Sequence, residues 1–261
     1  MTEIMEDNGI MKQTVTVKNV EFGAGQPKIC LPVVARDDGE ISRQMAAIAC
    51  CQPDLVEFRA DWYAATGDRS ARRFALDGIR TVLPQTPLLF TFRTAREGGE
   101  REISETDYLR LCLEVIEDSA ADLIDVELFM GDEIVRQIVE AAHAQGMAVI
   151  ASSHDFAKTP ARDALLRRFR AMEALGADLL KIAVMPQCPE DVLTLLSATA
   201  EMDAAGTRPV ISMSMGPLGA ISRLCGEQFG SCVTFGAAGK ASAPGQIEAR
   251  ALRTILETLH N

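Results

Sequence analysis

Apolar runs alternate with amphipathic stretches at a steady spacing along most of this chain. Eight segments have the almost continuous apolar character of buried strands: Lys28–Ala35, Leu55–Arg59, Leu88–Arg93, Leu123–Glu127, Ala148–Ser153, Leu179–Ala183, Pro209–Met213 and Cys232–Phe235. Between them lie stretches of helical periodicity, among them Tyr108–Asp118, Ile134–Gln145, Ala161–Leu175, Pro189–Met202 and Ile247–His260. Strands that are buried on both faces and followed by helices predict a parallel sheet.

The number and spacing of these units favour a closed (β/α)8 TIM barrel. Eight units in about 230 residues fit this fold, which typically takes about 250 residues. A doubly wound open sheet is the alternative, but no Gly-x-Gly-x-x-Gly motif follows the first strand. Ahead of that strand, Thr14–Lys18 and Val20–Phe22 alternate apolar and polar residues, which predicts a β-hairpin that closes the bottom of the barrel.

No linker, low-complexity segment or repeat of fixed period interrupts the pattern. We therefore predict a single barrel domain over residues 1–261, with a flexible segment at 1–13 and the hairpin within 14–27. The first residues are polar and acidic, without the basic start and apolar run of a signal peptide. No apolar run approaches the roughly 18 residues of a membrane span. These features predict a cytoplasmic protein with no membrane contact.

Composition narrows the classes of partner. Apolar residues make up 48% of the chain and charged residues 24%, as in an ordinary globular protein, and the net charge is -11. Nucleic acid binding needs a basic surface, so we expect none. A locally basic pocket for an anionic small molecule is compatible with an acidic protein. The seven cysteines show no Cys-x-x-Cys spacing, which favours reduced thiols over disulfides or a zinc site.

One residue conflicts with the apolar pattern. Lys181 lies near the end of the strand predicted at 179–183. Burying an ammonium group without a partner costs several kcal/mol, comparable with the net stability of a domain. Losing the charge lowers that cost, and a neutral amine in a pocket is a nucleophile toward carbonyl groups. Lys181 therefore suggests Schiff-base chemistry, although a lysine here could equally extend to the rim as a surface residue.

Further polar residues gather where the predicted strands end. Active sites of (β/α)8 barrels lie at the carboxyl ends of the strands, so these side chains should face one another. They are Glu57, Arg59, Arg93, Glu97, Asp125, Glu127, His154, Lys181, Arg223, Ser242 and Gln246.

Each of these residues also has an ordinary structural interpretation. Glu57 and Arg59 lie two residues apart on a strand and could form an ion pair inside the barrel mouth. Arg93 and Arg223 could be salt-bridge partners, although arginine is also the usual clamp for a carboxylate. His154 could be a hydrogen-bonded structural histidine. The remaining carboxylates and the loop residues carry no specific signal when each is taken alone.

Taken together, the motifs resemble the type I 3-dehydroquinate dehydratases of the shikimate pathway. The resemblance runs from Pro27 to His260 and depends on the order and spacing of the motifs jointly. The motifs are Glu57-Phe58-Arg59, Pro87–Arg93 with Glu97-Gly98-Gly99-Glu100, Ser153-His154-Asp155-Phe156, Gly176-Ala177-Asp178, Lys181–Pro186, Ser212–Gly216, Ile221-Ser222-Arg223 and Ser242–Gln246.

The resemblance implies a lyase that removes water from 3-dehydroquinate to give 3-dehydroshikimate, a step toward aromatic amino acids. It implies a homodimeric barrel that needs no metal and no dissociable cofactor. Lys181 matches the Schiff-base lysine, His154 the general acid and base, and Glu97 the carboxylate that orients the histidine. Substrate-binding positions are matched by Arg223, on the substrate carboxylate, with Ser242 and Gln246, and by Glu57, Arg59 and Arg93, around the ring hydroxyls.

Two other functions remain to be distinguished. Another Schiff-base barrel, such as a class I aldolase, usually binds phosphate on a Gly-rich loop after the last two strands. The corresponding region here offers Arg223, Ser242 and Gln246, which suit a carboxylate better. A non-catalytic ligand-binding barrel is the second alternative. Pro32 stands where many relatives have a serine, and proline supplies neither a hydroxyl nor a backbone donor for substrate.

Overall fold

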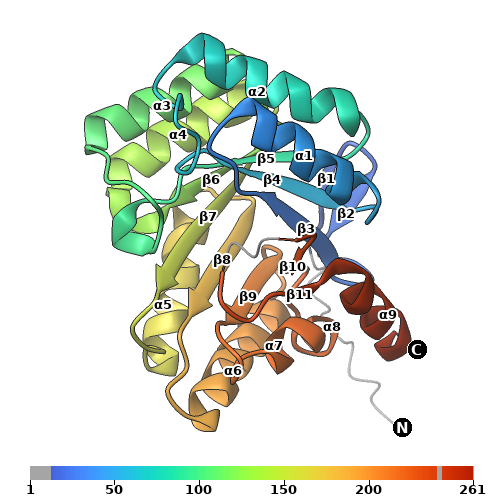
Figure 1. Ribbon diagram of the computed structural model, residues 1–261. Helices are drawn as coiled ribbons and strands as arrows, with labels where there is room; N and C mark the ends of the chain where they lie inside the picture. The colour runs from blue at the N-terminus through green and yellow to red at the C-terminus, as the bar shows by residue number, and fades with distance from the viewer. Residues whose placement is uncertain (1–12, 240–242, 261) are drawn as a thin grey trace, which may run out of the picture.

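The computed structural model describes residues 13–239 and 243–260. Within these ranges, eight parallel strands form the wall of a barrel, with helices around its outside (Figure 1). The strands are β3 (Lys28–Val33), β4 (Leu55–Arg59), β5 (Leu88–Thr91), β6 (Leu123–Glu127), β7 (Ala148–Asp155), β8 (Leu179–Val184), β9 (Val210–Ser214) and β10 (Val233–Ala237). Each strand overlaps the segment predicted for it, and the (β/α)8 class is confirmed.

Strand pairing carries the sheet around the barrel. Parallel ladders run from β10 through β3 and onward to β9, with Val233 opposite Lys28 at the β10–β3 junction. Between β9 and β10 the closure is shorter: a bridge joins Val210 to Ser231, and the Cys232 N–H donates to the Val210 carbonyl at 2.8 Å. The short strand β11 (Ile247–Glu248) extends the sheet beside β10. The carboxyl ends of the barrel strands therefore meet at one rim.

A β-hairpin fills the opposite end of the barrel. Its strands, β1 (Val15–Val17) and β2 (Val20–Phe22), pair antiparallel with Val17 opposite Val20. Val17 and the fully buried Phe22 pack on one inward residue from each barrel strand: Cys30, Leu55, Leu89, Leu123, Ile150, Leu179, Ile211 and Val233. The hairpin predicted to close the barrel's bottom is thus confirmed. The flexible segment predicted at 1–13 lies, apart from residue 13, outside the described residues.

The outer layer consists of long amphipathic helices. They are α1 (Asp38–Ala49), α2 (Arg69–Val82), α3 (Glu105–Glu117), α4 (Asp132–Ala144), α5 (Arg162–Ala174), α6 (Pro189–Ala205) and α9 (Ala249–Leu259). The helical segments named from periodicity correspond to α3, α4, α5, α6 and α9. Asp37, Asp68 and Ser104 cap α1, α2 and α3 by accepting hydrogen bonds from backbone N–H groups of the first turn. The apolar helix faces bury the outward strand residues in a second core.

The unit after β9 departs from this regular pattern. In place of one long helix it has two four-residue helices, α7 (Ile221–Leu224) and α8 (Gly226–Phe229), within the described chain. The Ser222 hydroxyl accepts a hydrogen bond from the Ser214 N–H at 2.8 Å, and the Ser231 hydroxyl accepts one from the Ser212 N–H at 2.9 Å. The first bond holds α7 against the end of β9, and the second holds the segment after α8 against the middle of the same strand. As a result, Arg223 is drawn into the barrel mouth instead of onto an outer helix.

Candidate active site

A pocket opens at the carboxyl ends of the barrel strands. The space it encloses, about 480 Å³ including its open mouth, is continuous with solvent. Its wall contains every described residue to which the family resemblance gives a role: Glu57, Arg59, Arg93, Glu97, His154, Lys181, Arg223 and Gln246. Ser242 lies outside the described residues. Strand ends far apart in sequence thus bring one set of charged side chains together, as the barrel topology requires.

Lys181 projects from β8 into this pocket and is only 3% exposed, so it is not a surface lysine at the rim. Its Nζ lies 3.2 Å from Asp125 Oδ2 and 3.7 Å from Glu57 Oε1. The ring of Phe235 lies under the amine, with its centroid 4.5 Å from Nζ. Two carboxylates and an aromatic face therefore surround the buried amine and lower the cost of burying it as an ammonium group.

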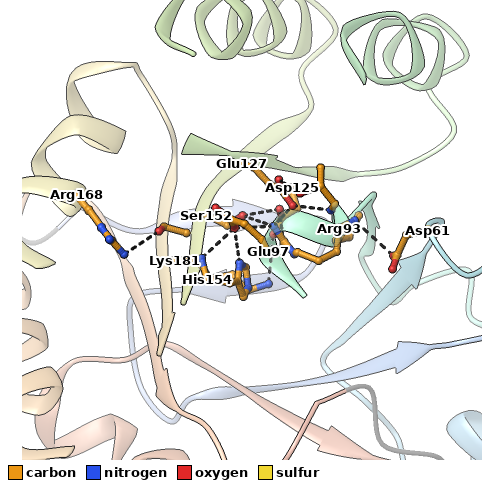
Figure 2. Close-up of polar contacts among 12 residues, drawn as sticks. Asp61, Arg93, Glu97, Asp125, Glu127, Ser152, His154, Arg168 and Lys181 are labelled. Atoms are coloured by element: carbon orange, nitrogen blue, oxygen red, sulfur yellow. Dashed lines mark hydrogen bonds and ion pairs between the residues drawn. The ribbon is translucent and has the colours of Figure 1, made fainter. Parts of the chain in front are cut away.

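Arg93 from the end of β5 organises the carboxylates beside Lys181 (Figure 2). Its Nη2 donates to Asp125 Oδ1 at 2.7 Å, and its Nη1 donates to Glu127 Oε1 at 3.0 Å and to the Ser152 hydroxyl at 2.9 Å. Burial lowers the pKa of Arg93, but Asp125, Glu127 and Glu97 outweigh it and hold that pKa above its ordinary value. Arg93 is therefore a fixed cation among buried anions.

Glu97 meets His154 across the pocket. The carboxylate ends the short 3-10 helix η1 (Ala95–Glu97), which follows β5, and the imidazole projects from β7. Glu97 Oε2 lies 2.9 Å from His154 Nδ1 and accepts the His154 backbone N–H at 2.9 Å. The strand predicted to end at 153 continues to Asp155, so His154 is held within the sheet. Glu97 thus fixes the ring and leaves Nε2 available to the pocket.

The turn that presents Glu97 depends on close packing of the backbone. Glu127 Oε1 accepts the Thr94 N–H at 2.8 Å and Glu127 Oε2 accepts the Thr94 hydroxyl at 2.7 Å, which anchors the start of η1. Gly98 follows with φ +81, and a Cβ there would lie 2.3 Å from the Phe156 ring. Both the left-handed conformation and the contact require glycine at this position. The Glu-Gly-Gly sequence therefore places the carboxylate rather than forming a hinge.

Burial sets the protonation of the Glu97–His154 pair. It raises the pKa of Glu97 to about 8, although Arg93 acts in the opposite direction. Burial also holds the pKa of His154 well below its ordinary value, and the cations Arg93, Lys181 and Arg59 act in the same direction. The imidazole is accordingly neutral at pH 7, as a base must be.

Arg223 lines another side of the pocket, and two of its donors have no partner among the described residues. Its Nη2 donates to the Pro244 carbonyl at 3.1 Å, whereas Nε and Nη1 are buried and make no hydrogen bond to any described residue. Burial lowers the pKa of Arg223 to about 10, so the guanidinium remains charged at neutral pH. A buried cation with two unused donors is ready for an anionic ligand, and a carboxylate matches its geometry.

The remaining wall comes from β4 and the last loop. Arg59 donates from Nε and Nη2 to the two oxygens of Asp61, each at 2.8 Å, and Glu57 accepts the Thr91 hydroxyl at 2.9 Å. Arg59 and Glu57 therefore do not pair with each other, contrary to one reading of the sequence; each has its own fixed partner. Ala243 and Gln246 also contribute to the lining of the pocket.

Three residues that shape the site received no role from the sequence, although Asp125 was among the polar residues placed at the strand ends. Asp125 is the nearest carboxylate to Lys181, Asp61 holds Arg59 and the Glu100 N–H, and Phe235 lies under the amine. Asp125 precedes Glu127 by two residues on one strand, so both project into the lumen. That spacing is the signal that could have identified Asp125. Phe235 reads as an ordinary core residue in the sequence.

Two other features bear on the kind of site. The described residues include no group of three or more histidine, cysteine, aspartate or glutamate side chains arranged to hold a metal ion. Among the helices described, none is long and apolar enough to cross a membrane. The pocket brings together a buried amine, a neutral imidazole backed by a carboxylate, and an anion-binding guanidinium. This combination suits a carbonyl compound that bears a carboxylate.

Comparisons with known proteins agree with this chemistry. The family model described as type I 3-dehydroquinase matches residues 29–261. The 3-dehydroquinate dehydratase of Listeria welshimeri is 49% identical over 246 residues, which are 94% of this chain and 98% of that protein. The crystal structure of the type I enzyme from Clostridium difficile, with covalently modified comenic acid, superposes with a TM-score of 0.91 at 45% identity over 96% of this chain and 99% of that one. The 3-dehydroquinate dehydratase from Geobacillus kaustophilus gives 0.92 at 39% identity, covering 96% and 98%.

Proposed function

Since the chain belongs to the type I 3-dehydroquinase family, we propose that it dehydrates 3-dehydroquinate to 3-dehydroshikimate through a Schiff base on Lys181. The observation that carries the assignment of roles is the buried Lys181 amine, which shares one pocket with the His154–Glu97 pair and with the unused donors of Arg223. A substrate carboxylate is enough to occupy the free donors of Arg223, and no phosphate group is required. This disfavours an aldolase that binds a phosphorylated substrate.

The first step joins the substrate ketone to the lysine. Once Nζ has given up a proton, its lone pair attacks the carbonyl carbon, and loss of water from the resulting carbinolamine leaves a protonated imine. The imine is an electron sink, so the proton on the neighbouring carbon becomes acidic enough for a neutral imidazole to remove. A plain ketone would not activate that proton to the same degree.

His154 then acts twice on adjacent carbons. Its Nε2 takes the proton next to the imine, and the resulting imidazolium is stabilised by the Glu97 carboxylate on Nδ1. The electron pair moves through the enamine and expels the hydroxyl group on the next carbon, which leaves as water after the imidazolium protonates it. Hydrolysis of the conjugated imine releases the product and restores Lys181. Figure 2 shows His154 beside Lys181, as both tasks require.

Binding residues orient the ring for these steps. Arg223 would donate to the substrate carboxylate from Nε and Nη1, the donors that lack a partner among the described residues. Glu57, Arg59 and Arg93 line the wall where the ring hydroxyls would lie. Gln246 and Ser242 would close from the last loop, and the Pro244 carbonyl already accepts from Arg223. Fixing the ring in this way lowers the entropic cost of reaction.

Three finer assignments extend this proposal. We infer a homodimer, a cytoplasmic location, and a role in the shikimate pathway toward aromatic amino acids, because the family resemblance implies all three. Size-exclusion chromatography with light scattering tests the first: a monomer at micromolar concentration contradicts it.

Turnover decides the activity itself. With purified protein and 3-dehydroquinate, we expect ultraviolet absorbance to increase as the conjugated enone forms. Borohydride reduction during turnover, followed by peptide mass spectrometry, should place a covalent adduct on Lys181. Well-folded protein that gives no absorbance change refutes the dehydratase assignment, and an adduct at another lysine refutes the role of Lys181.

A further inference from the structure

We propose that Asp125 is the counter-ion of the imine formed on Lys181 and that its carboxylate keeps the imine nitrogen protonated while His154 removes the neighbouring proton. This inference rests on the proposed function, because it concerns the same covalent intermediate. It assigns a catalytic task to a buried carboxylate that neither orients His154 nor faces the ring hydroxyls.

The two oxygens of Asp125 have separate partners. Oδ1 accepts from Arg93 Nη2 at 2.7 Å and from the Ser152 hydroxyl at 2.7 Å. Oδ2 lies 3.2 Å from Lys181 Nζ, and no other described residue donates to it. The side chain is fully buried, and Arg93 with Lys181 holds the pKa of Asp125 below its ordinary value despite burial. One oxygen therefore anchors the carboxylate, and the other is reserved for the lysine nitrogen.

Glu57 is the competing carboxylate, and its geometry is poorer for this task. Its Oε1 lies 3.7 Å from Nζ, beyond a normal hydrogen bond, and the same oxygen already accepts the Thr91 hydroxyl at 2.9 Å. Asp125 is both closer to the nitrogen and held by two donors on its other oxygen. A charge that is held in place before reaction stabilises the intermediate without reorganisation, which favours Asp125.

The chemistry of the nitrogen defines what the counter-ion must do. A lysine ammonium carries three N–H groups, whereas a protonated imine carries one, so most of the contacts around Nζ are lost when the imine forms. The single remaining N–H needs one acceptor, and Oδ2 lies 3.2 Å from the nitrogen that carries it. Only the protonated imine withdraws electrons strongly, so the carboxylate acts directly on the step that breaks the C–H bond.

Other charged groups surround the nitrogen and contribute to its field. On β4, β5, η1, β6 and β7 these are Glu57, Arg59, Arg93, Glu97, Glu127 and His154. Burial raises the pKa of the thiols of Cys30, which lies deeper in the lumen, and of Cys112, which lies on α3 behind the strands, so both stay neutral. Among these groups Asp125 makes the shortest contact with Nζ, and its removal should change the field at the imine most.

Substitution of Asp125 by asparagine tests the proposal, because the amide keeps the size of the side chain and loses the charge. Cyanoborohydride reduces the protonated imine and leaves the neutral imine and the ketone, so the Lys181 adduct formed with 3-dehydroquinate measures the protonated imine as a function of pH. In Asp125→Asn we expect the pH above which trapping declines to fall by about 1–3 units, the range for loss of an adjacent opposite charge. We expect kcat at pH 7.5 to fall about tenfold or more.

Glu57→Gln is the matched comparison, since it removes the more distant carboxylate. In Glu57→Gln we expect trapping of the Lys181 imine to decline above the same pH as in wild type, even if KM changes. If Glu57→Gln shifts the decline and Asp125→Asn does not, Glu57 is the counter-ion and the proposal is overturned. An Asp125→Asn profile that coincides with wild type in both trapping and turnover also overturns it.

Two controls keep the result interpretable. If Asp125→Asn does not fold, Asp125→Glu keeps the charge and should retain the wild-type pH of the decline with a lower kcat; a profile displaced downward in this variant contradicts a counter-ion role. Wild-type turnover and the wild-type Lys181 adduct test the proposed dehydratase function separately. Failure of those two measurements refutes the function, whereas their success with unchanged Asp125 variants refutes only the present inference.

Discussion

The two ends of the barrel lumen are built by the same strands and have opposite character. At the amino ends, the inward residues are apolar, such as Leu55, Leu123 and Leu179, and Phe22 of the hairpin packs on them. Two residues further along the same strands, the inward positions are Glu57, Asp125 and Lys181. Strand periodicity is unbroken between the two layers, so only residue type changes.

This difference separates stability from chemistry within one fold. The apolar layer gains from burial and excludes water from the base of the pocket. The charged layer loses hydration, and it is tolerated because Arg93, Asp125, Glu127 and Ser152 satisfy one another. Among the described residues of the site, Arg223 Nε and Nη1 and Glu97 Oε1 are the buried polar atoms without a hydrogen-bond partner. Substitutions at the two ends should therefore affect different measured quantities.

The largest effect is expected from Lys181→Ala, which removes the nucleophile from the charged layer. We expect kcat to fall by on the order of 10⁶-fold, as for loss of other covalent nucleophiles, because no imine can form. The protein should stay folded, since Asp125 keeps Arg93 and Ser152 as partners. An ultraviolet absorbance assay of 3-dehydroquinate turnover measures kcat, and circular dichroism shows whether the protein is folded. Residual activity within tenfold of wild type contradicts covalent catalysis at this residue.

Phe22→Ala should produce the reverse pattern at the apolar end. The fully buried ring fills the base of the lumen, so its loss should lower the free energy of unfolding by about 3–5 kcal/mol. We expect kcat below the unfolding transition to stay within about twofold, because the charged layer keeps its own contacts. Urea unfolding and turnover at 25 °C measure both quantities, with Phe22→Leu as the control that removes less volume. If kcat falls well beyond twofold while the free energy of unfolding also falls, the two ends of the lumen are coupled.

The sequence predicted the fold better than the contacts within the site. Apolar runs located each barrel strand because strands buried on both faces leave a continuous signal, and the hairpin was visible as an alternation ending at Phe22. The site residues could be placed together because strand ends share a rim. The pairing of Lys181 with Asp125 could not be predicted, since it depends on the register of β6, β7 and β8 across 56 residues of sequence. Arg223 likewise enters the pocket through a short helix that has no periodic signal.

A smaller effect is expected at Arg223, which has two donors without a hydrogen-bond partner among the described residues. Arg223→Met should lower kcat/KM by about 10²–10³-fold, because the substrate carboxylate loses a buried charged partner. The same change should raise the free energy of unfolding by about 1 kcal/mol, since it replaces buried donors that have no partner among the described residues. Steady-state kinetics and urea unfolding measure these changes.

Arg223→Lys keeps the charge without the planar pair of donors and serves as the control for this substitution. We expect its kcat/KM to lie between those of wild type and Arg223→Met. Loss of stability in Arg223→Met with unchanged kcat/KM indicates a structural arginine and contradicts the clamp.

The smallest effect concerns the proton carried by Glu97. Because burial raises the pKa of Glu97 to about 8, the carboxylate that stabilises the imidazolium of His154 becomes fully populated only above that pH. We therefore expect kcat/KM to rise with pH and to level off above about 8. Glutamine at this position accepts the Nδ1–H but does not titrate. In Glu97→Gln the rise should then follow His154, whose pKa is held well below its ordinary value, so the rise moves to more acidic pH and the plateau falls by about tenfold. If the pH–rate profile of Glu97→Gln has the same shape as that of wild type, another group causes the rise of kcat/KM with pH. Glu97 then has no part in the proton chemistry and only connects the charged layer to β5.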